Sequence, residues 1–203
     1  MIGIIDYGVG NLFSLRSSFA SLGQDVIVSG DADVLAGADR LVLPGVGAFA
    51  DAAQKLRDTG LDQFVIRQAN AGKPLMGICL GMQMLFEKSF EYGEHQGIGI
   101  LKGQVVPMAG VIDPKLKVPH MGWNQLKKLN PQSRLLSDIS DGEYVYFVHS
   151  YFATGCEQSL VAVADYSIPL TAVVEQGNVF GCQFHPEKSG TVGLRILNRF
   201  CNL

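Results

Sequence analysis

Lys73-Pro74-Leu75-Met76-Gly77-Ile78-Cys79-Leu80-Gly81 joins an extended-looking apolar run to a Gly-x-Cys-x-Gly turn. Small residues on both sides of Cys79 allow a strand to turn sharply into a helix, which leaves the turn residue strained and exposed. The following helix presents free N–H groups and the positive end of its dipole, and both favour a thiolate. The pattern therefore predicts a strand over 73–78, a helix over 80–86 and a reactive sulfur between them.

The residues before this stretch alternate between strand and helix patterns. Short buried-type runs alternate with segments whose apolar residues have helical spacing, such as positions 12, 15, 19 and 22. Repeated βα units imply a parallel sheet with helices on both faces. We predict strands over 2–5, 24–28 and 40–43, and helices over 11–22, 31–36 and 61–71.

After about residue 97 the pattern changes to short β-like runs broken by Gly, Pro and Asn, which predict antiparallel hairpins. The clearest pair is 171–175 and 179–183, joined through Gln176-Gly177-Asn178. We predict the other strands over 104–108, 121–126, 144–148 and 160–164, and a last helix over 191–201. The predicted fold is α/β, a doubly wound, mostly parallel sheet with helices on both faces plus a smaller antiparallel β region in the C-terminal half.

Composition sets limits on the class of protein. The 203 residues, 47% hydrophobic, suffice for one core, so we expect a single domain over 1–203, with two small domains as the alternative. A net charge of −3 gives no electrostatic case for nucleic acid or an anionic membrane. No basic leader or apolar run of membrane-spanning length is present, which predicts a cytoplasmic location. Cysteines 156, 182 and 201 lack metal-site spacing and are expected to be buried thiols, so no metal is predicted.

A thiol nucleophile needs a base and a group that orients the base. His185 precedes Pro186, which favours an extended backbone, and positions i and i+2 of an extended segment point the same way. Glu187 is therefore predicted to orient His185. The alternative is that this segment only caps the last helix. Of the other histidines, His95 is expected to be exposed and His120 structural, while His149 is structural or lines a polar pocket.

Glycine-rich turns offer backbone amides. Pro44-Gly45-Val46-Gly47 follows a predicted strand and could expose N–H groups to a developing oxyanion, with the amide of Leu80 as the second donor. Two stretches look like dinucleotide-binding loops, but 8–10 has Phe13 at the third glycine position and 45–50 lacks a first βαβ unit. No nucleotide cofactor, and no other cofactor, is expected.

These motifs together resemble a known family. Gly-x-Cys-x-Gly with Gln83 four residues past the cysteine, and Phe184-His185-Pro186-Glu187, are similar to the triad class of glutamine amidotransferases. Nearly the whole chain resembles the glutaminase subunits of imidazole glycerol phosphate synthases, through the stretches Ile5-Asp6-Tyr7-Gly8-Val9-Gly10-Asn11, Leu43-Pro44-Gly45-Val46-Gly47-Ala48-Phe49, Pro119-His120-Met121-Gly122-Trp123-Asn124 and His185-Pro186-Glu187-Lys188-Ser189.

The resemblance implies a role for each matching residue. Cys79 would attack the carboxamide of glutamine, His185 would transfer protons, and Glu187 would orient His185. The amides of Val46 and Leu80 would hold the oxyanion, and four residues would line the glutamine pocket: Gly47, Gln83, Ser150 and Tyr151. The ammonia would pass to a cyclase subunit with a (βα)₈ barrel fold, in a heterodimer that makes imidazole glycerol phosphate and an aminoimidazole carboxamide ribotide for histidine biosynthesis. The contact with that subunit would include Asn11, Trp123, Tyr146 and Lys188.

The sequence leaves three alternatives open. The chain could serve another pathway as an amidotransferase, for anthranilate, guanylate or pyridoxal phosphate synthesis, although the setting of Trp123 and Lys188 weighs against this. It could be a cysteine peptidase or chaperone-like hydrolase, which leaves Gln83 and the His-Pro-Glu segment unexplained. It could be a noncatalytic binding subunit, against which the intact Cys79, His185 and Glu187 argue.

Overall fold

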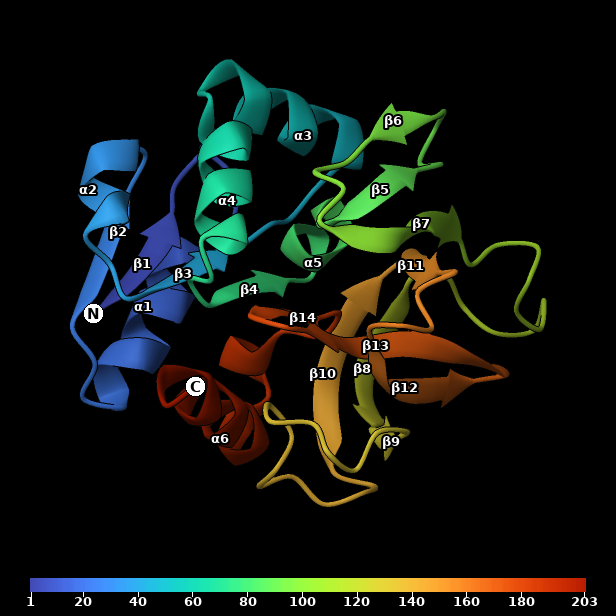
Figure 1. Ribbon diagram of the computed structural model, residues 1–203. Coiled ribbons are helices and arrows are strands. Elements are labelled where there is room, and N and C mark those ends of the chain that lie inside the picture. The colour runs from blue at the N-terminus through green and yellow to red at the C-terminus, as the bar shows by residue number, and fades with distance from the viewer.

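The computed structural model describes all 203 residues and consists of three β-sheets with helices packed around the largest one (Figure 1). The helices are α1 (Leu12–Ser21), α2 (Ala32–Ala36), α3 (Phe49–Asp58), α4 (Leu61–Asn70), α5 (Leu80–Met84), the 3-10 turn η1 (Pro186–Lys188) and α6 (Gly190–Cys201). The strands are β1 (Ile2–Ile5), β2 (Val26–Ser29), β3 (Arg40–Leu43), β4 (Leu75–Ile78), β5 (Phe86–Ser89), β6 (His95–Gln96), β7 (Leu101–Pro107), β8 (His120–Gln125), β9 (Lys127–Lys128), β10 (Tyr144–His149), β11 (Tyr151–Thr154), β12 (Leu160–Tyr166), β13 (Ile168–Gln176) and β14 (Val179–Cys182). No helix is both long and apolar enough to cross a membrane.

The main sheet has eight strands in the order β2-β1-β3-β4-β14-β13-β12-β9. The pairs from β2 to β14 are parallel, and the pairs from β14 to β9 are antiparallel. The predicted α/β class and the β13–β14 hairpin are confirmed. The hairpin strands do not form a region apart from the parallel sheet, however, because β14 pairs with β4 and so continues that sheet.

Side chains that alternate along the parallel strands build one core on each face of this sheet, as expected for strands covered on both sides. Ile4 and Met76 belong to the core that includes Phe19 of α1 and Phe200 of α6. Leu75, the neighbour of Met76, belongs to the other core, which includes residues of α2, α3 and α4. Figure 1 shows α3 and α4 on one side of the sheet and α1 and α6 on the other.

The two smaller sheets lie in the middle of the chain. One has the order β11-β7-β5-β6, and the other is the antiparallel ribbon β8–β10. The predicted helix over 80–86 is therefore wrong at its end, since α5 stops at Met84 and Phe86 begins β5, which pairs in parallel with β7. The prediction also missed α3, whose mixed Ala-rich sequence follows the glycine-rich turn. Tertiary strand pairing outweighs local helix propensity in the first case.

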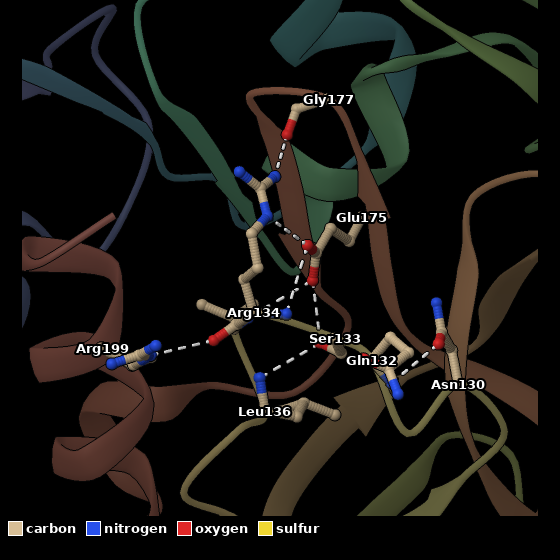
Figure 2. Close-up of polar contacts among 9 residues, drawn as sticks. Asn130, Gln132, Ser133, Arg134, Leu136, Glu175, Gly177 and Arg199 are labelled. Atoms are coloured by element: carbon tan, nitrogen blue, oxygen red, sulfur yellow. Dashed lines mark hydrogen bonds and ion pairs between the residues drawn. The ribbon is translucent and has the colours of Figure 1, made fainter.

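A partly buried carboxylate anchors the β13–β14 hairpin to the loop before β10 (Figure 2). Glu175 accepts hydrogen bonds from Ser133 Oγ at 2.8 Å and from Arg134 Nε at 2.9 Å. Arg134 also donates to the carbonyl of Gly177 in the hairpin turn, and its own carbonyl accepts from Arg199 Nε of α6 at 3.0 Å. These contacts hold the hairpin whose second strand leads directly to His185.

Candidate active site

Cys79 occupies the sharp turn between β4 and α5. Its backbone has φ 54° and ψ −112°, in a region that non-glycine residues rarely adopt. The flanking glycines are required by close packing, because a Cβ on Gly81 would lie 1.9 Å from the carbonyl oxygen of Leu43 and one on Gly77 would lie 2.7 Å from that of Gly81. The turn therefore packs directly onto the end of β3 and the loop that follows it.

The predicted base and its orienting carboxylate are in contact. His185 Nδ1 lies 2.8 Å from Glu187 Oε1, and the two side chains are 3% and 1% exposed. His185 is extended, as expected before a proline, but Glu187 lies in the turn η1. The pairing was predicted correctly but the i, i+2 geometry behind it was wrong: the 3-10 turn, rather than a continuing strand, brings the carboxylate back to the ring.

Opposing effects act on the His185 imidazole. Burial alone would lower its pKa, but the hydrogen bonds to Cys79 and Glu187, with the negative charges of both groups, outweigh burial and raise the pKa to about 9. Because a carboxylate only accepts hydrogen bonds, Nδ1 is the protonated nitrogen that faces Glu187. Nε2 is then the nitrogen available to the sulfur, which is the arrangement that a proton-transferring base requires.

Cys79, His185 and the predicted oxyanion and pocket residues line one cavity of about 510 Å³. Glu187 does not line it, because it lies behind His185. The loop after β3 forms part of the wall, where Gly47 has φ +93° and Tyr7 Oη supports the loop by donating to the carbonyl of Pro44 at 2.7 Å. The predicted residues that the structure brings together here are Cys79 and His185, Val46 and Leu80, and Gly47, Gln83, Ser150 and Tyr151.

Comparison with known proteins identifies the family to which this arrangement belongs. Residues 3–202 match the sequence model of the family described as glutamine amidotransferase class-I. The chain belongs to the class-I glutamine amidotransferases. Among curated relatives, it is 50% identical to the imidazole glycerol phosphate synthase subunit HisH of Geobacillus thermodenitrificans, over 100% of this chain and 96% of the relative. It is 51% identical to the HisH subunit of Bacillus licheniformis, over 98% of this chain and 95% of the relative.

Solved structures of amidotransferases share the fold. A crystal structure described as a glutamine amidotransferase superposes with a TM-score of 0.77 at 20% identity, covering 99% of this chain and 97% of the other. A chain in the structure of PurLQS from Thermotoga maritima superposes with a TM-score of 0.71 at 20% identity, covering 99% of this chain and 97% of the other. The expected class-I glutamine amidotransferase fold is thus confirmed for the whole chain.

This class-I amidotransferase also has cavity residues that the sequence interpretation did not assign. Glu91 and Tyr92 line the cavity, and Glu91 Oε2 accepts from the backbone N–H of Phe49 at 2.5 Å. His149 lines it as well, so both halves of the prediction for that residue fit the structure. No short motif marks Glu91 or Tyr92, because they reach the cavity only through the folding of the β5–β6 turn.

His149 and His120 belong to one chain of hydrogen bonds, and both imidazole rings are neutral. Its Nδ1 donates to the carbonyl of Tyr151 at 2.8 Å, its Nε2 lies 3.0 Å from Nδ1 of His120, and Asn124 Nδ2 lies 3.1 Å from Nε2 of His120. Burial lowers the pKa of each ring to about 4. Neither is placed to act as the base, and the structural role predicted for His120 agrees with these contacts.

The residues matched to a subunit contact lie outside the cavity on adjoining elements. Trp123 of β8 is 55% exposed and faces Tyr146 of β10, with ring centroids 6.0 Å apart. Lys188 is exposed on η1, which packs against both β10 and α1, and Asn11 immediately precedes α1. The three remaining cysteines are buried thiols, and burial raises the pKa of each.

Proposed function

We propose that this chain is the glutaminase subunit of an imidazole glycerol phosphate synthase, which hydrolyses glutamine and supplies ammonia to a partner subunit. The observation that carries the proposal is one cavity that contains a cysteine on a positive-φ turn and a histidine held by a buried carboxylate. The HisH subunits that are 50% and 51% identical in sequence to this chain support the choice of pathway. We propose that the whole chain acts as one domain in the cytoplasm.

The first half-reaction uses the sulfur as nucleophile. The proton of the Cys79 thiol passes to His185 Nε2, where the raised pKa of about 9 favours it, and the sulfur attacks the side-chain carbonyl carbon of glutamine. The tetrahedral oxyanion forms beside the backbone amides of Val46 and Leu80, which are its proposed donors. His185 then gives its proton to the leaving nitrogen, so that the C–N bond breaks and ammonia departs. A glutamyl thioester on Cys79 remains.

Water completes the turnover by attacking the thioester. His185 removes a proton from the water, the C–S bond breaks, and glutamate leaves with the thiol restored. Glu187 keeps Nδ1 protonated throughout and stabilises the imidazolium, which is the part played by the carboxylate in hydrolytic triads. Gly47, Gln83, Ser150 and Tyr151 are the proposed contacts to the rest of the glutamine molecule.

The partner is proposed to be a cyclase with a (βα)₈ barrel, bound in a heterodimer at Asn11, Trp123, Tyr146 and Lys188. Ammonia in water at neutral pH is mostly protonated and is then not a nucleophile, so direct transfer to the partner preserves its reactivity. Trp123 and Tyr146 offer aromatic surface of the kind that dominates interface energetics. We expect weak glutaminase activity in isolation and strong stimulation when the partner binds its nucleotide ligand.

The proposal is tested by measuring glutamate production by the chain alone, with a cognate cyclase, and with cyclase plus nucleotide substrate. An alkylating glutamine analogue should stop turnover and add its mass to the peptide that carries Cys79. The Cys79→Ala variant is expected to fold and to bind the partner but to produce no glutamate. Modification at another residue, or glutamate formation by the Cys79→Ala variant, would contradict the proposal.

A further inference from the structure

Gln183 is a buried polar residue between β14 and His185 for which the proposed mechanism has no role. Its side chain is fully buried, with 0% of the residue exposed. A buried primary amide is costly unless its hydrogen bonds are satisfied. Gln183 finds partners in two residues of the cavity: Gln83 Nε2 lies 3.0 Å from its Oε1, and its own Nε2 lies 3.8 Å from the sulfur of Cys79.

The direction of this chain of hydrogen bonds is fixed at its far end. Gln83 Nε2 also lies 3.0 Å from the backbone carbonyl of Tyr151, which can only accept. The Gln83 amide must therefore present its NH₂ group, whose second hydrogen goes to Gln183 Oε1. With its oxygen committed to Gln83, Gln183 can present only N–H to Cys79. The Tyr151 carbonyl thus fixes the orientation of the Gln83 and Gln183 side-chain amides, so that an N–H donor faces the sulfur.

The Cys79 sulfur has two polar neighbours, one of which favours the thiol and the other the thiolate. The thiol of Cys79 donates to the carbonyl of Val148 at 3.9 Å, a contact that a thiolate cannot make. The Gln183 N–H, in contrast, gains strength when the sulfur becomes negative, because hydrogen bonds to ionised acceptors are stronger than neutral ones. The Gln183 amide would stabilise the thiolate without transferring a proton to it.

We propose that Gln183 is a further catalytic residue of the glutaminase, a hydrogen-bond donor to the Cys79 sulfur that stabilises the attacking thiolate. The proposal rests on the proposed function for the identity of the reaction. In the step concerned, the thiol proton moves to His185 Nε2 and the S–C bond forms as the C=O π bond opens to give the oxyanion, while the covalent bonds of Gln183 are unchanged. Gln183 also keeps Gln83 oriented, but its effect on the sulfur is separable from that role by experiment.

The test is the rate at which iodoacetamide alkylates Cys79 as a function of pH, followed by peptide mass, in the wild-type chain and in Gln183→Met. In this reaction the thiolate attacks carbon and iodide leaves, so the rate reports the thiolate fraction. Loss of the N–H donor should raise the pH midpoint by about one unit and lower kcat for glutamine about tenfold, with a smaller change in KM. The titratable groups around the sulfur and its cavity are unchanged in this variant: His185, His149, Tyr7, Glu91, Tyr92 and Tyr151.

Three controls keep the outcome clear. Gln54→Met makes the same chemical change on the exposed side of α3 and should leave the midpoint and kcat unchanged. Cys79→Ala identifies labelling at the other cysteines. If circular dichroism shows that Gln183→Met does not fold, Gln183→Leu replaces it, because it also removes the N–H donor and adds no charge beside the sulfur.

An unchanged alkylation midpoint in a folded Gln183 variant would overturn the proposal. A rise in KM alone, with kcat and the midpoint unchanged, would also overturn it, because Gln183 would then act only by holding Gln83. Alkylation requires no glutamine, so the experiment separates the two proposals. A wild-type chain that fails to hydrolyse glutamine even with its partner refutes the function but leaves the Gln183–sulfur contact testable.

Discussion

Replacing Glu187 with Gln should make the stability of the protein depend on pH in a defined way. Glu187 Oε1 bonds His185 Nδ1 at 2.8 Å, while Oε2 is buried without a hydrogen-bond partner, so the imidazolium is the main compensation for the buried charge. The rise in the pKa of His185 from its ordinary 6.5 to about 9 corresponds to about 3 kcal/mol of stabilisation at low pH. Cys79 and Glu187 both contribute to this rise in the pKa of His185. We assign about 2 kcal/mol to the Glu187 contact, which is the usual contribution of a hydrogen bond to a charged group.

The sign follows from the proton count. Because the pKa of His185 is raised in the folded state, its contribution to stability is fully present below about pH 6.5 and is lost as the pH rises through about 9. The neutral amide in Glu187→Gln would lower that pKa, so the folded wild type would retain a proton that the folded variant has already released. The wild type's advantage over Glu187→Gln should therefore fall by about 2 kcal/mol between about pH 6.5 and about pH 9.5.

The assay is urea unfolding of both proteins at half-unit steps between about pH 6 and about pH 10, with the same pair in a Cys79→Ser background. In the Cys79→Ser background the stability difference between the protein with Glu187 and its Glu187→Gln variant should also decrease with rising pH, but over a lower pH range. Glu187 still raises the pKa of His185 when the thiolate is absent, although it then does so by itself. His120 and His149, with pKa values of about 4, are neutral throughout and do not contribute. A difference between wild type and variant that is constant with pH, or that grows as the pH rises, would show that Glu187 does not raise the pKa of His185.

Gly81→Ala should prevent folding or lower the melting temperature by many degrees, because its Cβ would lie 1.9 Å from a carbonyl oxygen of β3. The control is Gly37→Ala, which should fold normally in the same thermal scan, because Gly37 has φ −74° and the nearest atom to an added Cβ is 3.5 Å away. Ser189→Ala should cost about 1–3 kcal/mol in urea unfolding and reduce kcat, since the buried Ser189 Oγ donates to the His185 carbonyl at 2.6 Å; normal stability and kcat would contradict this. In ¹⁵N NMR spectra, His149 should show no titration between about pH 5.5 and about pH 8, whereas His185 should titrate near pH 9. A midpoint near 6.5 would contradict the burial of His149 or, for His185, its contacts with Cys79 and Glu187.

Much of the fold could be predicted because the main sheet repeats a local pattern. Four of its parallel strands and the α1 and α4 helices have clear periodicity, and the β13–β14 hairpin has a recognisable turn. The β5 strand and the end of α5 could not be predicted, because residues 80–86 have a helical pattern that strand pairing with β7 interrupts. Gln183 could have been suspected from its place two residues before His185, but its partner atoms could not.

The chemistry that each short segment can support is encoded in its own few residues. The residues of Gly77-Ile78-Cys79-Leu80-Gly81 specify a tight turn with a sulfur at its tip, and Pro186 next to His185 specifies an extended histidine, because both depend on backbone sterics over a few bonds. Cys79 and His185 are 106 positions apart, and they share a cavity only because of the three-dimensional fold. The parallel pairing of β4 with β14 places both strand ends at one edge of the sheet. That pairing also brings the amide of Gln183 to the sulfur, in an orientation set by the carbonyl of Tyr151.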